Sequence, residues 1–207
     1  MIDQNEPHWF PMRIRHSSLQ RLTLMLQRLD MQKEQLAKDG VLLEAYAPMR
    51  FIRVSMNKMD FAPYLLNFVF VRSTFNNLVK VKSNQELFEP LRFVMHPAYD
   101  ANFNSHDEVV YISDKAMSDY QRVTESENGN VVFLRDLQYA VKPSQAVQIT
   151  EGEFTGVVGR IKRIRGKRCV VLTVSDSQAC AIVDVHRDHL RCLTDEEAHA
   201  LQEGITY

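Results

Sequence analysis

Glycine is distributed very unevenly along this chain of 207 residues, and this distribution constrains the fold more than any other feature of the sequence. Gly40 is the only glycine among the first 128 residues, whereas the last 79 contain six. A glycine-poor segment favours longer helices and strands, while a glycine-rich one favours short strands joined by tight turns. The chain is therefore predicted to contain two domains of different construction, a number that its length allows.

The polar stretch Glu125–Asn130 lies where the glycine content changes and is interpreted as a linker. The predicted organisation is an N-terminal domain over 1–124, a linker over 125–140, a small C-terminal domain over 141–195 and a tail over 196–207. The two domains are expected to fold separately in a monomeric protein.

The N-terminal domain begins with a predicted strand over 8–14, in which Pro11 indicates an edge strand or a bulge. Ser17 or Ser18 can cap a following helix, and Gly40 can end it in the left-handed conformation. The helix carries one apolar stripe formed by Leu19, Leu22, Leu26, Leu29 and Leu36. The stripe covers only about three heptads and is interrupted by Lys33, so packing on the domain's own sheet is favoured over a coiled coil.

Apolar patterning predicts the remaining elements of this domain. Strands are expected over 41–47, 51–54, 64–72 and 91–95, a short helix over 75–79, and a last helix that is capped by Ser113 and buries Met117, Tyr120 and Val123. The segment 97–108 is interpreted as a long loop. This order predicts an α+β domain, in which helices pack on a mostly antiparallel sheet.

Short strands dominate the predicted C-terminal domain. Gly152, Gly156 and Gly159 recur within eight residues, which suits a tight turn followed by a strongly bent strand. The triplet 165–167 reads as the tip of a hairpin, and a further strand is predicted over 181–185. Five short strands in about 50 residues indicate a small SH3-like β-barrel.

Basic residues gather in two regions, although the net charge of the whole chain is only −1. The segment 7–29 contains four arginines and no acidic residue. The segment 141–175 contains seven lysines and arginines against Glu151 and Glu153. Bulk charge therefore gives no case for a polyanionic partner, but both segments are candidates for contact with phosphates.

The compartment is predicted from the cysteines and the N-terminus. Three cysteines are an odd number for a disulfide framework, and the polar, acidic start of the chain does not read as a secretory signal. No run approaches the roughly 18 apolar residues of a membrane-spanning helix. A cytoplasmic protein without membrane contact is expected.

The segment Ile149–Gly156 resembles a KOW motif, which occurs in ribosomal proteins, translation factors and NusG transcription factors. Segments that resemble the NusG N-terminal domain precede it in family order: Trp9-Phe10, Ala47-Pro48, Pro63–Arg72 and Val110–Met117. The resemblance covers about residues 8 to 193 and is closest to specialised NusG paralogues, including UpxY-type antiterminators of polysaccharide operons. The chain departs from the family at Leu66, where proline is common, and at Ser144, where glycine is common.

The resemblance implies a bacterial transcription elongation or antitermination factor that binds the clamp helices of RNA polymerase. The implied docking residues are Trp9, Phe10, Phe68 and Phe70, the last two on a partly exposed strand face. Their alternative role is core packing. The family's contacts to non-template DNA map to Arg13, Arg15 and His16, whose alternative role is a solvated edge. The family's second polymerase-contact motif is not found in the segment 97–108 or before it.

The KOW domain is expected to bind a second partner, such as nascent RNA, a ribosomal protein or a termination factor. The candidate residues for this contact are Phe154, Arg160, Lys162, Arg163, Arg165, Lys167 and Arg168. Six basic residues of one sign exceed what solubility requires, although a charged hairpin also discourages aggregation. A ribosome- or RNA-binding KOW protein that does not act on polymerase is the alternative function.

Neither metal binding nor catalysis is predicted. His186, His189 and Cys192 have ligand-like spacing, but residues three apart on a strand face opposite ways and no paired CxxC is present. The sequence contains no GxSxG, phosphate-binding loop, HExxH or glycine-rich dinucleotide turn. A binding protein without a cofactor is therefore expected.

Overall fold

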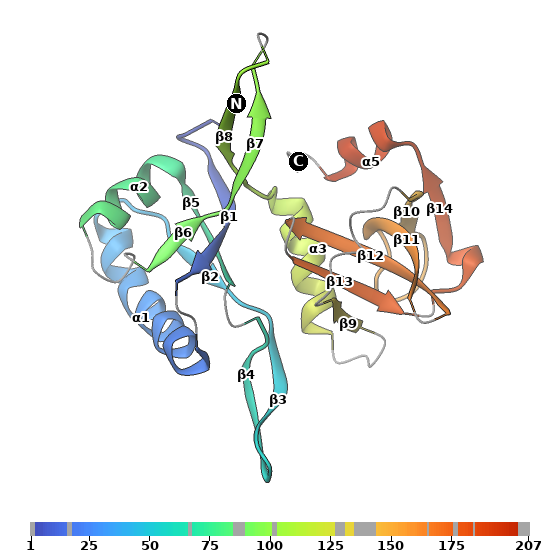
Figure 1. Cartoon of the computed structure of the whole chain (residues 1–207), viewed down its shortest axis with the longest axis horizontal. Coiled ribbons are helices and arrows are strands. Elements are labelled where there is room, and N and C mark those ends of the chain that lie inside the picture. Colours follow the sequence, from blue (N-terminus) through green and yellow to red (C-terminus); the bar gives the residue numbers. More distant parts are fainter. Residues whose placement is uncertain are drawn as a thin grey trace. The chain divides into compact units, whose positions relative to one another are not determined.

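The computed structural model describes residues 3–15, 18–65, 68–84, 90–100, 103–126, 131–134, 144–164, 166–175, 178–183 and 185–202. The chain forms two compact units that divide between Tyr111 and Ile112 (Figure 1). The second unit therefore begins before the predicted linker over 125–140. Among the described residues, no helix is both long and apolar enough to cross a membrane.

The first unit consists of a sheet, two helices and two hairpins. Its elements are β1 (Pro7–Ile14), α1 (Leu19–Lys38), β2 (Glu44–Tyr46), β3 (Met49–Ser55), β4 (Lys58–Pro63), β5 (Phe68–Thr74), α2 (Phe75–Asn84), β6 (Leu91–Phe93), β7 (Met95–Tyr99) and β8 (Ser105–Val109). Ser18 caps α1 by accepting from the amide of Arg21, and Gly40 follows the helix with a φ of 74°. Both predicted helix boundaries are confirmed.

The central sheet of the first unit is antiparallel and has the order β2-β5-β1-β6. β1 lies inside this sheet, so the prediction of an edge strand from Pro11 is wrong. The ladder between β1 and β6 covers only Met12–Ile14, and Pro11 lies one residue beyond it. The carbonyl of Pro11 accepts from the amide of Val94, so the side of β1 that lacks an N–H faces the end of β6.

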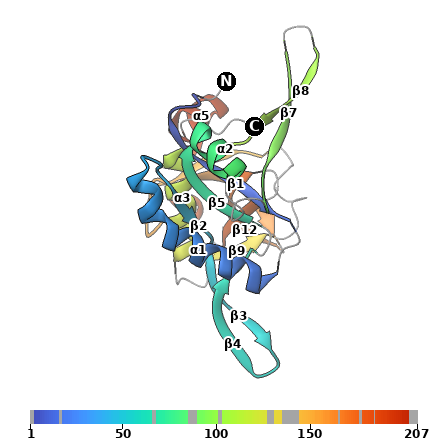
Figure 2. The same ribbon diagram turned by 90° about the vertical axis from the view of Figure 1, so that its left-hand side faces the viewer.

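Helices α1 and α2 cover one face of this sheet (Figure 2). The apolar stripe of α1 packs there, which confirms the predicted packing on the domain's own sheet. The core of the first unit contains Phe10, Met12, Ile14, Leu22, Met25, Leu29, Leu36, Leu43, Val69, Val71, Leu78, Val81 and Leu91. Alternation along the strands leaves Phe68 and Phe70 on the opposite face.

Two hairpins that the sequence analysis did not resolve extend from the first unit. β3 and β4 pair with Phe51 opposite Phe61, and β7 pairs with β8 from Met95–Val109 to Tyr99–Ser105. The predicted long loop over 97–108 is therefore wrong, because most of this segment is strand. The segment shows no clear alternation of apolar and polar residues, because both faces of the hairpin are largely solvated and carry histidines and acids.

The second unit is built on an antiparallel sheet of the order β14-β10-β11-β12-β13-β9. Its elements are α3 (Asp114–Glu125), β9 (Val131–Leu134), β10 (Ala146–Ile149), β11 (Val158–Ile164), β12 (Lys167–Ser175), β13 (Gln178–Val183), the 3-10 turn η2 (Arg187–His189), β14 (Leu190–Leu193) and α5 (Asp195–Gln202). The predicted hairpin at 165–167 is confirmed as the β11–β12 connection. β9 lies within the predicted linker and pairs with β13, while α5 occupies the predicted tail.

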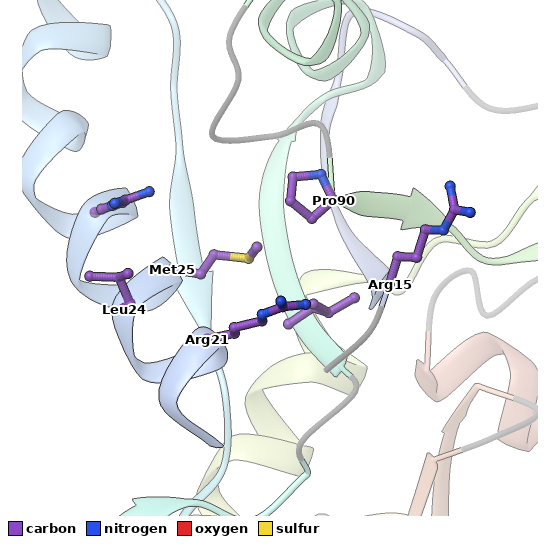
Figure 3. A pocket seen from close by; sticks show the side chains of 7 residues that line it. Arg15, Arg21, Leu24, Met25 and Pro90 are labelled. Carbon is purple, nitrogen blue, oxygen red and sulfur yellow. The ribbon is translucent and has the colours of Figure 1, made fainter. Parts of the chain in front are cut away.

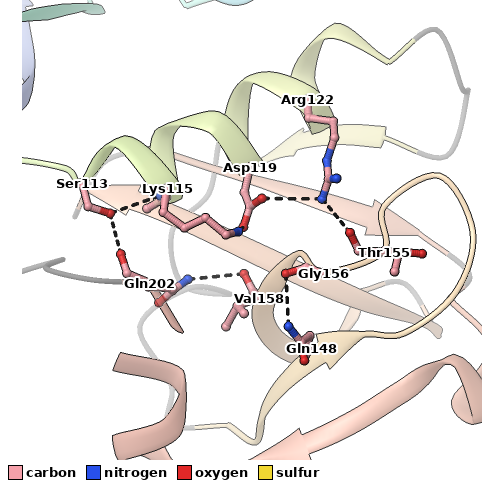
Figure 4. A network of polar contacts seen from close by, with 10 residues as sticks. Ser113, Lys115, Asp119, Arg122, Gln148, Thr155, Gly156, Val158 and Gln202 are labelled. Carbon is pink, nitrogen blue, oxygen red and sulfur yellow. Dashed lines mark hydrogen bonds and ion pairs between the residues drawn. The ribbon is translucent and has the colours of Figure 1, made fainter. Parts of the chain in front are cut away.

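Helix α3 packs against β12 and β13, so it belongs to the C-terminal unit. Ser113 caps it as predicted, and Met117, Tyr120 and Val123 are buried. Asp119 is also buried and forms ion pairs with Lys115 and Arg122 (Figure 4). The guanidinium of Arg122 donates to the carbonyl of Thr155 at 3.0 Å, which joins the helix to the turn between β10 and β11.

Gly152, Gly156 and Gly159 were predicted to form a tight turn and to allow close packing of the following strand. Gly152 and Gly156 have φ values of 86° and 88°, which side chains rarely adopt. Gly159 has no such φ, but a Cβ added there would lie 2.7 Å from both Val170 Cγ1 and the carbonyl oxygen of Val171. The absence of a side chain at this position therefore allows β11 to approach β12 closely.

We expect Gly159→Ala to destabilise the C-terminal unit by about 1–3 kcal/mol, because overpacking against a backbone carbonyl forces the strands apart. Hydrogen exchange of β12 amides, followed by mass spectrometry, measures the loss. Gly166→Asn is the control: its φ is 81° but its surroundings are open, and asparagine tolerates this conformation. Equal protection in Gly159→Ala and the wild type would contradict the packing argument.

Candidate functional site

The predicted docking aromatics of β5 are buried in this structure. Phe68 is 1% and Phe70 0% exposed, so the expectation that the folded chain leaves their face partly exposed is wrong. Phe68 packs with Leu65, Val94 and Val110. The ring of Phe70 lies 6.3 Å from that of Tyr46 on β2. A strand with apolar residues on both faces is typical of burial on both sides. The sequence alone did not show whether the face with Phe68 and Phe70 is buried.

The two predicted docking residues of β1 are buried as well. Phe10 belongs to the core beneath the helices, where its ring contacts those of Phe75 and Phe93. Trp9 lies on the other face of β1 and pairs across the strands with Arg72. The guanidinium of Arg72 is held by Glu44 at 3.0 Å. Trp9, Phe68 and Phe70 thus share one face of β1 and β5, whereas Phe10 lies on the other face, beneath the helices.

The basic residues predicted to contact DNA lie at the end of β1. Arg13 is exposed, and its guanidinium lies 5.5 Å from the ring centroid of its cross-strand neighbour Phe68. Arg15 is exposed and follows the strand, and its amide donates to the carbonyl of Pro90 at 3.0 Å. His16 lies outside the described residues. Arg13 and Arg15 therefore have different surroundings despite their predicted common face.

Arg15 lines a pocket of about 200 Å³ between the end of β1 and helix α1 (Figure 3). The other lining residues are Ile14, Arg21, Leu24, Met25, Arg28 and Pro90. Three of the described lining residues are arginines and none is acidic, so the described part of the lining is basic around an apolar floor. The volume lies below the roughly 300 Å³ at which drug-sized pockets begin, so the pocket suits one small anionic group such as a phosphate.

Arg21 and Arg28 were not among the predicted contacts. They are seven residues apart on α1 and flank Leu24 and Met25, a spacing that places all four on one helix face. The signal was therefore present, since both arginines lie in the acid-free segment 7–29. This signal could predict the pocket only once Pro90 was known to lie across from this helix face.

Two of the residues predicted to bind a KOW partner have structural roles. Phe154 is buried in the turn between β10 and β11, and its carbonyl accepts from the amide of Val157. The guanidinium of Arg160 donates to the carbonyl of Ser144 at 2.7 Å and to Asp195 at 2.8 Å. It therefore links β11 to the residues before β10 and to the start of α5. The predicted partner contact of Phe154 and Arg160 stays a prediction.

The β11–β12 hairpin places two of the predicted basic residues directly opposite each other. Arg163 pairs with Arg168 in the ladder, next to the pair formed by Lys162 and the buried Cys169. Like charges directly opposite each other destabilise a sheet, so this pair favours an anionic partner over a purely structural role. Lys167 lies at the same end of the hairpin. Arg165 is outside the described residues.

The histidines near the C-terminus do not assemble a metal site in the described part of the chain. The rings of His186 and His189 lie 5.5 Å apart, and His189 contacts Glu151 at 3.3 Å. No group of three or more His, Cys, Asp or Glu residues that could hold a metal ion is found among the described residues. His189 thus lies beside the turn between β10 and β11, and neither histidine has an assigned role.

Comparison with known proteins gives little further guidance. No protein-family model matches the chain, and no curated protein matches it. One solved structure, which describes domain interaction in Thermotoga maritima NusG, aligns with 93% of this chain and 100% of its own at a TM-score of 0.45 and 16% identity. A TM-score below 0.5 is too low to argue from, so the case for a function comes from the chain's own residues.

We expect Phe68→Ala to destabilise the first unit by about 3–5 kcal/mol, as removal of a buried phenylalanine side chain usually does. Trp9 is the single tryptophan of the chain and is buried in this unit, so its fluorescence during denaturant unfolding reports the first unit alone. Phe51→Ala is the matched control, because Phe51 is 72% exposed and its loss should cost under about 0.5 kcal/mol. Similar midpoints for both variants would refute the burial of Phe68.

The basic pocket predicts the salt dependence of binding to single-stranded DNA. Arg15→Ser combined with Arg28→Ser should reduce the slope of log K against log salt by about 1.4, since each lost phosphate contact contributes about 0.7. Lys33→Ser combined with Lys38→Ser removes the same charge from exposed positions of α1 outside the pocket. An equal loss of slope in both double variants would mean that net charge, rather than the pocket, determines binding.

Proposed function

We propose that this chain is a transcription elongation or antitermination factor of the NusG type. Its first unit binds RNA polymerase, and its second unit recruits another partner through the KOW segment. The chain acts by binding and not by catalysis. A protein that binds the elongating state of polymerase more tightly than the paused state shifts the population toward elongation.

The observation that carries this proposal is the pairing of β1 with β5. The Trp9-Phe10 segment and the segment around Phe68–Arg72 resemble the NusG N-terminal domain, and they lie 58 or more residues apart in the sequence. In the structure Trp9 is opposite Arg72 and Phe10 opposite Val71 in adjacent strands. Two resemblances found separately in the sequence thus belong to one sheet, as a common origin requires.

The KOW segment supports the second half of the proposal. It occupies the connection between β10 and β11, and its two positive-φ glycines form the turn. β14, the last strand of the unit, pairs with β10, which is the first strand after the segment 135–143. This pairing is compatible with the SH3-like barrel that we propose for the KOW module.

Docking on polymerase through Phe68 requires a change in the first unit, because residues of this unit bury its side chain. Leu65, Val94 and Val110 would have to leave Phe68 before a partner could contact it. In this proposal the exposed basic residues make the first contacts instead. The pocket with Arg15, Arg21 and Arg28 holds a phosphate of the displaced non-template strand.

The β11–β12 hairpin favours an anionic partner for the second unit. Arg163 and Arg168 face each other across the ladder and have no ion pair within the described residues. RNA and an acidic protein both fit this arrangement. The same pair is the reason to retain the alternative function, an RNA- or ribosome-binding KOW protein that does not act on polymerase.

We expect the immobilised full-length chain to retain purified core RNA polymerase in a buffer with about 0.1 M salt, and the isolated first unit to retain it as well. Purified ribosomes serve as the competing prey. Retention of ribosomes without polymerase would replace the proposed function by the alternative one. Retention of polymerase by the second unit alone would contradict the assignment of docking to the first.

A further inference from the structure

The β7–β8 hairpin carries, next to its tip, the most exposed aromatic side chain among the described residues. Phe103 is 87% exposed, and Tyr99 and Met95 are also exposed. Met95, Pro97 and Tyr99 alternate along β7 and therefore share one face of the hairpin. The hairpin extends beyond the central sheet of its unit in both views (Figures 1 and 2). An exposed apolar face on a projecting hairpin is typical of an interaction site.

Hydrogen bonds join the described residues on the two sides of the hairpin tip. The carboxylate of Asp100 accepts from the backbone amide of Asn104 at 2.8 Å and from its side-chain amide at 3.0 Å. The amide of Phe103 donates to the carbonyl of Asp100 at 3.0 Å. Phe103 itself has a φ of 61°, a conformation that bulky residues rarely adopt. Asparagine or glycine would suit this position better, so the fold alone does not explain a phenylalanine here.

The charge of the hairpin restricts what can bind to it. The chain contains no lysine or arginine between Arg92 and Lys115, whereas Asp100, Asp107 and Glu108 lie within the hairpin. Asp107 is the cross-strand neighbour of Pro97 and therefore belongs to the apolar face. A phosphate backbone would be repelled from this surface. A basic protein surface would be attracted to it.

We propose that the β7–β8 hairpin is an anchor on RNA polymerase, which inserts Phe103 into an apolar pocket with a basic rim. This inference rests on the function proposed above and adds a contact to it. Enzymes that hold nucleic acids carry clusters of lysine and arginine near their channels. Such clusters provide the complementary charge for Asp107, while the rigid aromatic at the tip provides the buried contact that dominates affinity at most interfaces.

The β3–β4 hairpin of the same unit provides a contrast. It also exposes aromatics, Phe51 and Phe61, whose ring centroids lie 5.2 Å apart. Its strands carry Arg53 and Lys58, however, and its Asp60 is paired with Lys58 at 3.2 Å. The two hairpins are therefore of opposite charge. A basic surface of a partner attracts the β7–β8 hairpin alone, which makes the other hairpin a natural control.

The test measures the affinity of the full-length chain for purified core RNA polymerase of the source organism. Phe103→Asn removes the aromatic, and asparagine tolerates the left-handed backbone, so the tip should keep its shape. We expect binding to weaken tenfold or more. Asp107→Lys should also weaken binding, with an effect that shrinks as salt is raised. Met56 lies at the tip of the β3–β4 hairpin and is 90% exposed. Met56→Asn should change the affinity less than twofold.

Trp9 fluorescence during denaturant unfolding shows whether each variant keeps a folded first unit. Normal polymerase binding by a folded Phe103→Asn variant would overturn the inference and leave the proposed function intact. Absence of binding by the wild-type chain would overturn both. If light scattering shows that the wild type self-associates and that Phe103→Asn does not, the occupant is a second copy of the chain and the inference is wrong.

Discussion

The pairing of β1 with β5 determines most of what the first unit can do. Seven residue pairs, from Pro7–Thr74 to Arg13–Phe68, hold the two strands in one register. This register places Phe10, Val69 and Val71 beneath the helices and Phe68 with Phe70 on the other face. Because side chains alternate along a strand, a shift by one residue would exchange these two sets. The helices could then no longer pack on the sheet in the same way, since the large rings of Phe68 and Phe70 would take the places of Val69 and Val71.

The same register separates charges from the apolar core. It brings Arg13 over the ring of Phe68, and it ends β1 where Arg15 meets α1 and Pro90. The basic pocket is thus a consequence of how the first strand joins the first helix. The acidic β7–β8 hairpin follows β6 at another edge of the unit. The first unit therefore carries basic and acidic surfaces at separate places.

The sequence predicted elements well wherever one face was apolar. The stripe on α1, the caps at Ser18 and Ser113, and the β11–β12 hairpin all produce local signals, and all are confirmed. Local patterns could not show which strands are neighbours. The burial of Phe68 and Phe70 on a second apolar face was therefore only one of two alternatives, and the packing of α3 on β12 and β13 was not predicted.

The candidate site was predicted only in part for the same reason. Arg15 was found because it lies next to the resemblance to the NusG family, while Arg21 and Arg28 contribute to the pocket through the helix face. The structural contacts of Phe154 and Arg160 were not predicted, because burial and hydrogen bonding depend on residues far away in the sequence. Asp195, which holds Arg160, is 35 residues further on.

The inner position of β1 also has a consequence for synthesis of the chain. Its partners are β5, which begins at Phe68, and β6, which begins at Leu91. β1 leaves the ribosome before both partners and therefore remains unpaired by them while α1 and the β3–β4 hairpin, whose backbone contacts are local, can already form. Long-range pairing of this kind slows folding, because a large loop must close before any contact compensates. During that interval the exposed edges of β1 are the part of the nascent chain most open to wrong pairing, and Pro11 removes one hydrogen-bond donor from them.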